Sequence, residues 1–201
     1  MLRTTPADNR SAHPLPAQLR PWWARSWAGS CALLGLCGLL SACSPTLNWR
    51  VVDIGPQTQV QFPCKPEHAE RALVLAGAPA RAAMWACEAG GVSWSATLLD
   101  VRDPAQLGDV LRESRLSLAR RLQGREESVQ PVQLRGMTPN AEARRVVILG
   151  PVGEGQPARA EAVFVTRGLQ VFQLVAMAQR GRPADWADSA DEFLRSVRWP
   201  S

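Results

Sequence analysis

The stretch "ARRVVILG" (residues 143–150) is followed closely by "ARAEAVFVT" (158–166) and "LQVFQLVAMA" (169–178). All three runs are apolar and rich in the β-branched and aromatic residues that favour strands. The glycine-rich connection "GPVGEGQP" (150–157) lacks the Gly-Lys-Ser/Thr ending of a phosphate-binding loop, and no helical pattern follows it. We therefore expect three consecutive strands, with a hairpin connection after the first and a tight turn at "RGL" (167–169).

A helix is predicted before these strands, in "DPAQLGDVLRESRLSLARRLQG" (103–124). Asp103 suits the N-cap, Pro104 suits the first helical position, and Gly124 can end the helix. One face carries residues at helical spacing: Leu107, Val110, Leu111, Ser114, Leu118 and Leu122. The opposite face is rich in arginine but diluted by glutamate, so we interpret it as a solvated face rather than a basic binding stripe.

Further strands are expected at 49–52, 58–62, 71–77, 81–89 and 90–100, and a last helix at 183–199. Within 90–100 one face is apolar, formed by Val92, Trp94, Ala96 and Leu98. The last helix has a stripe of Trp186, Ala190, Phe193, Leu194 and Val197. Trp94 and Trp186 are interpreted as core residues rather than as a ligand cage. This arrangement predicts an α+β fold with a mainly antiparallel sheet covered by helices.

Residues 1–42 have the pattern of a signal peptide: arginines precede an uncharged apolar run from Ala28 to Leu40. This run is shorter than the roughly 20 apolar residues of a membrane span. The formal net charge of the chain is +5. The leader has four arginines and one aspartate, a net charge of +3, which leaves +2 for residues 43–201. No nucleic-acid partner is expected from so small a surplus. An amphipathic cytosolic tail is the alternative interpretation of the leader.

The leader ends in Leu40, Ser41, Ala42 and Cys43, which resemble the lipobox of bacterial lipoproteins. In that family the cysteine thiol receives a diacylglycerol, a peptidase cuts before it, and several acyl chains such as palmitate make anchoring durable. The resemblance implies a lipid anchor on Cys43 at the periplasmic face of the cell envelope. Ser44, in place of an aspartate retention signal, favours the outer over the inner membrane. Residues 43–48 would then be a short linker to a single α+β domain, 49–201. A chance cysteine after an ordinary secretory leader is the alternative.

Two further cysteines follow the leader, Cys64 and Cys87. An even pair in an exported protein favours a disulfide. The rival is a metal or redox site, but neither clustered metal ligands nor a two-residue cysteine spacing is present. His68 is the only histidine after the leader and is expected in a solvated loop. We predict no catalytic residues, no metal and no cofactor.

Several phrases resemble the PsbP/Mog1-like superfamily of small exported proteins: "VQFPCKPE" (60–67), "DPAQL" (103–107), "QVFQLVAMA" (170–178) and "ADEFLRSVRW" (190–199). Phe172 stands where tyrosine is usual there, and Val197 where phenylalanine is usual. The resemblance implies an antiparallel sheet sandwiched by helices. It carries over no catalytic residues, because these phrases mark core and turns.

The leading functional hypothesis is a non-enzymatic lipoprotein that presents a binding or scaffold domain to an envelope protein partner, for example during envelope assembly. A lipid or small-molecule carrier is the second hypothesis. The third hypothesis is a hydrolase. Glu126 and Glu127 are adjacent in sequence, which is a poor sign of a glycosidase site, so its catalytic carboxylates would have to converge in three dimensions.

The anchor hypothesis predicts that Cys43→Ala releases the protein from membranes, because no other residue of the lipobox can form the thioether. The measurement is the distribution of full-length protein between membrane and soluble fractions, with mass spectrometry of residue 43. A mutant that stays on membranes without lipid contradicts the hypothesis.

Overall fold

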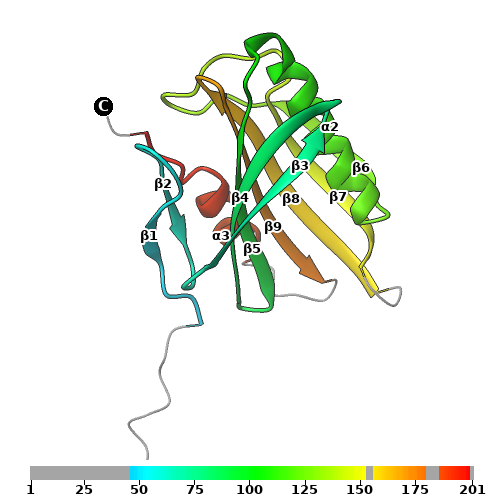
Figure 1. Cartoon of the computed structure of the whole chain (residues 1–201). Coiled ribbons are helices and arrows are strands. Elements are labelled where there is room, and N and C mark those ends of the chain that lie inside the picture. The colour runs from blue at the N-terminus through cyan, green and yellow to red at the C-terminus, as the bar shows by residue number, and fades with distance from the viewer. Residues whose placement is uncertain (1–45, 153–155, 180–185, 200–201) are drawn as a thin grey trace, which may run out of the picture. The chain divides into compact units, whose positions relative to one another are not determined.

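The computed structural model describes residues 46–152, 156–179 and 186–199 (Figure 1). All of these lie in one unit, Pro45–Ser201. The expected signal peptide and lipobox, with Cys43, lie outside the described residues.

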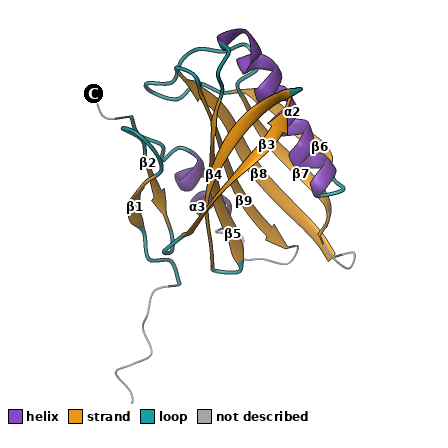
Figure 2. Cartoon of the chain, viewed as in Figure 1, coloured by secondary structure: helices purple, strands orange, loops and turns teal. Residues whose placement is uncertain are grey.

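Strands form two sheets, and the helices are few and short (Figure 2). The small sheet pairs β1 (Arg50–Asp53) with β2 (Gln59–Phe62). The large sheet contains β3 (Glu67–Leu75), β4 (Ala78–Ala89), β5 (Val92–Asp100), β6 (Arg125–Pro131), β7 (Arg144–Val152), β8 (Gln156–Arg167) and β9 (Gln170–Gln179). The helices are a 3-10 turn (Pro104–Gln106), α2 (Leu107–Arg121) and α3 (Trp186–Leu194).

The large sheet has the strand order β3-β4-β5-β9-β8-β7-β6, and every pairing is antiparallel. The three apolar runs at 143–150, 158–166 and 169–178 form β7, β8 and β9, and each pairs with the next along the chain. The prediction of an α+β fold with a mainly antiparallel sheet is confirmed.

The two faces of the large sheet pack against different elements. On one face, α3 and the small sheet pack over an aromatic cluster of Trp49, Phe62, Trp94 and Phe193. Ring centroids lie 5.4 Å apart for Trp94 and Phe193 and 5.2 Å apart for Phe62 and Phe193, in edge-to-face geometry. The Trp94 indole donates a hydrogen bond to the Ala89 carbonyl at 3.1 Å. Trp94 is therefore a core residue, as predicted, and Trp186 packs half-buried against the same cluster.

On the opposite face, α2 packs against β8 and β9. Its buried side chains are the predicted stripe from Leu107 to Ser114 and also Ala119, which the predicted stripe did not include. Leu118 and Leu122 are half-buried beside the cluster. The partners come mainly from β7, β8 and β9: Val146, Ile148, Ala160, Ala162, Phe164, Val171 and Val175. The helix therefore covers the half of this face that is richest in apolar side chains.

The residue predicted to cap the start of the helix does so, but the residue predicted to end it does not. Asp103 caps the 3-10 turn before α2, since its carboxylate accepts a hydrogen bond from the Ala105 N–H at 2.9 Å. At the other end the left-handed residue is Gln123, with φ 47°, not Gly124. Gly124 is instead required by close approach, because a Cβ there would lie 2.7 Å from Ile148 Cγ2 and 2.9 Å from the Leu149 carbonyl oxygen.

Two predicted elements differ in extent from the structure, and one strand was not predicted. The strand expected at 71–77 is β3, which begins at Glu67, so His68 is in a strand and not in a loop. There the imidazole stacks on Trp85 of β4, with ring centroids 4.6 Å apart, while staying 44% exposed. β6 was missed because its sequence, "REESVQP", is polar. It forms through its pairing with β7.

The third difference is the last helix, which ends at Leu194 and not at 199. After it, the Arg198 N–H and carbonyl exchange hydrogen bonds with Gln59 of β2, at 2.8 and 2.9 Å. The Ser196 hydroxyl accepts a hydrogen bond from the Gln61 N–H at 3.0 Å. Val197 is still buried, as its place in the apolar stripe predicted, but it reaches the core from an extended segment.

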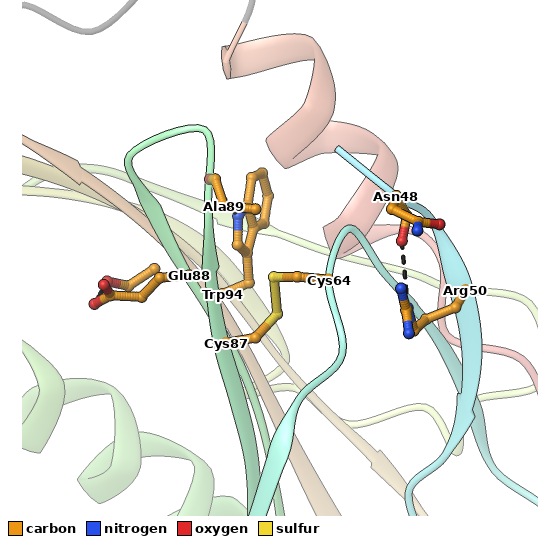
Figure 3. Close-up of a disulfide and its surroundings, with 8 residues drawn as sticks. Asn48, Arg50, Cys64, Cys87, Glu88, Ala89 and Trp94 are labelled. Carbon is orange, nitrogen blue, oxygen red and sulfur yellow. Dashed lines mark hydrogen bonds between the residues drawn. A yellow bond between two sulfur atoms is a disulfide. The ribbon is translucent and has the colours of Figure 1, made fainter. Parts of the chain in front are cut away.

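A disulfide joins Cys64, just after the small sheet, to Cys87 on β4 (Figure 3). The predicted pairing is present, and the two Cα atoms lie 6.1 Å apart across a sequence separation of 23. Both cysteines are half-buried against the aromatic cluster. The covalent bond therefore holds the chain leaving the small sheet against the large sheet.

Loss of this disulfide is expected to lower the free energy of unfolding by about 3 kcal/mol, because the unfolded chain regains the entropy of the closed loop. The measurement is urea unfolding of Cys64→Ser under oxidising conditions. The control is Ser93→Ala, a substitution that keeps both cysteines. Free thiols at both Cys64 and Cys87 in the native protein would contradict the pairing.

Candidate functional site

The face that carries α2 is hollowed beside the helix, between α2 and β3. We call this hollow the groove: its volume is about 620 Å³, its floor is β4, β5 and β9, and its two walls are β3 and α2. Figure 1 shows α2 lying toward the β6–β8 side of the sheet, away from β4 and β5. The groove is thus the part of the α2 face that the helix does not cover.

Side chains of β5 make the floor polar. Because alternate residues of a strand point to opposite faces, burial of Val92, Trp94, Ala96 and Leu98 in the aromatic face turns the residues between them toward the groove. These are Ser93, Ser95 and Thr97, and β9 adds Gln173, which is the register partner of Thr97.

Most of these polar groups are free. Ser93 donates a hydrogen bond to Glu88 at 3.1 Å. The side chains of Ser95, Thr97 and Gln173 make none with another described residue. They can therefore bond to a molecule in the groove without breaking an internal contact.

Half of the wall residues are apolar. They include Leu73 of β3 and Leu118 and Leu122 at the end of α2. Met84 and Met177 flank the polar floor, and Met84 is 41% exposed. Unbranched, polarisable methionine side chains adapt to differently shaped apolar partners. The walls therefore suit apolar groups, while the floor supplies hydrogen bonds.

One buried hydroxyl also lines the groove. Ser114 of α2 is 4% exposed, and its Oγ has no hydrogen-bond partner among the described residues. A buried hydroxyl without a partner costs free energy. Its position in the wall is a second sign, independent of the hollow itself, that a polar group can be accommodated there.

The groove rim carries both signs of charge, but only part of it is neutralised internally. Glu113 of α2 is paired with Arg120. Arg71 of β3 and Arg121 of α2, on opposite walls, make no ion pair within the described part of the chain. Glu70 of β3 also lines the groove, and its one ion-pair contact among the described residues is His68, at 3.8 Å. Because alternate residues of a strand point to opposite faces, Glu70 points to the face opposite Arg71. The groove side of the rim therefore presents two arginines without a carboxylate partner in the described ranges.

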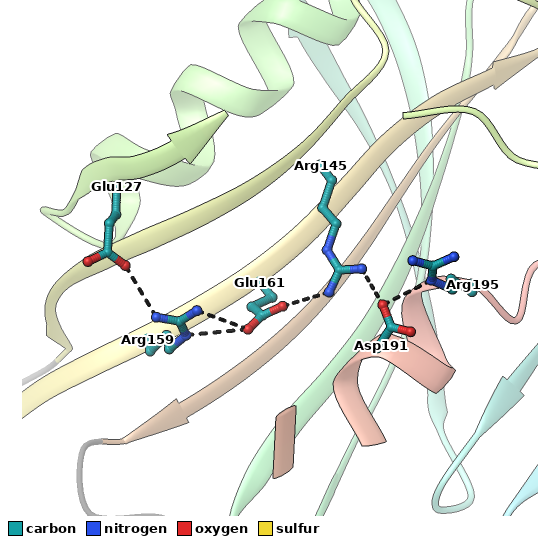
Figure 4. Close-up of polar contacts among 6 residues, drawn as sticks. All are labelled: Glu127, Arg145, Arg159, Glu161, Asp191 and Arg195. Carbon is teal, nitrogen blue, oxygen red and sulfur yellow. Dashed lines mark hydrogen bonds and ion pairs between the residues drawn. The ribbon is translucent and has the colours of Figure 1, made fainter. Parts of the chain in front are cut away.

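A second polar cluster lies on the other face, across β7, β8 and α3 (Figure 4). Arg145 bridges Glu161, at 2.9 Å, and Asp191, while Arg159 links Glu161 to Glu127 at 3.3 and 3.2 Å. Glu161 is only 5% exposed, so it depends on its arginine partners for neutralisation. Every carboxylate in this cluster is paired with arginine, which makes it a structural network that holds α3 against the sheet.

Asp191 shows the electrostatic effect of this network. Burial by itself would raise the pKa of Asp191, but hydrogen bonds from Arg145 and Arg195 outweigh burial and lower the pKa below its ordinary value. A general acid needs a raised pKa, so Asp191 has the opposite tuning.

Residues singled out by the sequence are dispersed. Cys43 and the lipobox lie outside the described residues, and the Cys64–Cys87 disulfide is structural. Glu126 pairs with Arg115 and Glu127 with Arg159, so these adjacent carboxylates serve different partners.

Sequence reasoning missed the groove. The available signal was the hydroxyl series at Ser93, Ser95 and Thr97, which alternates with the apolar residues of β5. The sequence did not show that α2 would leave this series uncovered.

Within the described ranges, no cluster of three or more histidine, cysteine or acidic side chains is arranged to hold a metal ion. In the same ranges no helix combines the length and apolar character required to cross a membrane.

Comparison with known proteins identifies no family for the chain. No protein-family model matches it, and no curated protein matches it. A crystal structure from Bacteroides thetaiotaomicron VPI-5482 is similar at 10% identity and TM-score 0.36, covering 76% of this chain but 42% of its own. PA94, a protein of unknown function from Pseudomonas aeruginosa, is similar at 13% identity and TM-score 0.36, covering 77% of this chain and 99% of its own. At these TM-scores neither likeness bears on the function.

The lowered pKa of Asp191 predicts an acid-dependent part of the stability. Since the folded pKa lies below the unfolded value of about 3.9, this contribution is complete above that value and is lost as pH falls through the folded pKa. Asp191→Asn should therefore lower the urea midpoint of unfolding at pH 7. Near pH 3 the midpoints of the variant and the unsubstituted protein should differ less than they do at pH 7. Asp188→Asn, an exposed site on the same helix, is the control. Equal pH dependence in the two variants contradicts the assignment.

Proposed function

We propose that this protein is a lipid-anchored, periplasmic-facing envelope protein whose non-enzymatic domain binds a segment of an envelope protein partner in the groove. The observation that carries the proposal is the combination of free hydroxyl and amide groups on the groove floor with apolar side chains on both walls. Such a lining provides both contact area and hydrogen bonds for a polypeptide, whose backbone and side chains require both.

The lining favours binding over catalysis. Among the described residues no histidine lines the groove, so its serines have no neighbouring imidazole there to activate them as nucleophiles. The carboxylates of the network on the opposite face are paired with arginine, and the pKa of Asp191 is lowered.

A carrier of lipids or other small molecules is the second candidate, since 620 Å³ lies within the range of small-molecule sites. The floor weighs against an acyl chain, because Ser95, Thr97 and Gln173 would lose water without gaining hydrogen bonds. A protein segment satisfies these groups, so it is the preferred occupant.

The cellular setting comes from the lipobox resemblance at Cys43, with Ser44 favouring the outer membrane. We also propose the PsbP/Mog1-like sandwich as the finer description of the fold. Its support is the set of resembling phrases, together with the location of α2 and α3 in different core clusters. In such a protein the anchor would keep the groove near the membrane surface, where envelope partners are found.

The test is site-specific photo-crosslinking in living cells. A photoreactive residue replaces Ser117, on the α2 wall of the groove, or Gln133, an exposed loop position outside it. We expect one envelope protein, crosslinked through a single segment, from position 117 and not from 133. Ser95→Leu, which fills the floor, should reduce this product at least several-fold while leaving the circular dichroism spectrum unchanged. Lipid adducts at 117 would favour the carrier, and identical products from both positions would refute groove binding.

A further inference from the structure

The two edges of the large sheet differ in how they are protected. β6, at one edge, is seven residues long, has a register irregularity between Glu126 and Ser128, and ends in Pro131. Bulges, prolines and charges are the features by which proteins prevent further strand pairing. β3, at the other edge, pairs with β4 over nine consecutive residues without irregularity and is exposed along most of its length.

The charged residues of β3, Glu67, Glu70 and Arg71, lie in its first half. Residues 72–75 are therefore the less protected part of this edge, and they lie beside the groove. β3 forms one wall of the groove, and part of it also contacts α2. Arg71, Leu73 and Leu75 alternate along β3 and pair with residues of β4 on the groove side, such as Ala82 opposite Arg71. Val74 of the same strand is 72% exposed. Unpaired backbone groups, exposed apolar surface and a hollow therefore occur together.

We propose that β3 accepts an extended segment of the partner as an eighth strand, with alternate side chains of that segment entering the groove. This inference rests on the proposed function and specifies how the partner binds. Main-chain hydrogen bonds to β3 would supply affinity, and the groove would select side chains at every second position. The four-residue spacing from Ser93 to Thr97 corresponds to about 13 Å of extended chain, so two or three inward side chains can lie along the floor.

Charge specifies the segment further. Arg71 and Arg121 face the mouth from opposite walls without ion pairs among the described residues. A strand between them that carries an acidic side chain at an inward position is complementary to both. The segment is therefore extended, apolar at some inward positions and acidic at another.

A second copy of this chain fits the edge less well. Arg71 is the central residue of β3 (67–75). Antiparallel pairing of two copies about the strand centre would place Arg71 opposite Arg71 of the other copy, and like charges directly opposite destabilise a sheet. A partner with an acidic residue at this position removes the repulsion.

The probe is a fluorescent heptapeptide, acetyl-Thr-Leu-Thr-Glu-Thr-Leu-Thr-amide, titrated into the full-length protein in detergent micelles. Only alternate amides of an added strand face the neighbouring strand. N-methylation of the leucine and glutamate amides blocks one set, and N-methylation of the threonine amides blocks the other. We expect one methylated peptide to bind at least tenfold more weakly and the other to bind like the parent. Equal effects of the two methylations, or no saturable binding below about 1 mM, overturn the proposal.

Charge reversal gives an independent check on the same protein. Arg71→Glu should weaken binding of the glutamate peptide about tenfold, and replacing that glutamate by lysine should restore it. Arg135→Glu, on an exposed loop outside the groove, is the matched control and should leave both affinities unchanged. If crosslinking from position 117 identifies a partner but the two methylations weaken peptide binding equally, partner binding in the groove is supported and strand addition to β3 is refuted. If crosslinking fails as well, both proposals fall.

Discussion

The architecture depends on a mismatch between the width of one helix and that of a seven-stranded sheet. Strands spaced about 4.8 Å apart make such a sheet nearly 30 Å wide, whereas a helix with its side chains is about 10 Å across. α2 therefore covers only part of its face, and it packs where β7, β8 and β9 present apolar side chains. The part left open is the groove, and the same geometry leaves β3 accessible at the edge.

On the other face, α3, the small sheet and the disulfide all pack near β5. Edge-to-face packing of Trp49, Phe62, Trp94 and Phe193 joins three separate elements, and the arginine–carboxylate network holds α3 beside it. β5 connects the two faces: its apolar residues are part of this cluster, and the hydroxyls between them form the groove floor. A rigid aromatic core thus supports the floor from behind.

Local patterns predicted the elements that are apolar and regular. The alternation in β5, the helical stripe of α2 with its Asp103 cap, and the three strands β7 to β9 were readable because their side-chain periodicity matches their burial. Prediction failed where burial did not determine the conformation. β6 and the first residues of β3 are polar and exposed, and they are strands only because β7 and β4 offer backbone partners. Gly124 was assigned to a helix stop, but the reason for glycine there is a neighbouring strand distant in sequence.

The sequence by itself determined the α+β class, the antiparallel order of the last three strands, the core role of Trp94 and the pairing of the two cysteines that follow the leader. It also contains the lipobox resemblance at Cys43, on which the anchor proposal rests. Which residues are left uncovered follows from the packing of distant elements: the floor from Ser93 to Thr97, the Ser114 hydroxyl without a described partner, and the edge of β3. Periodicity along a chain shows which side chains share a face, but whether that face is covered depends on the position of an element folded from another part of the chain.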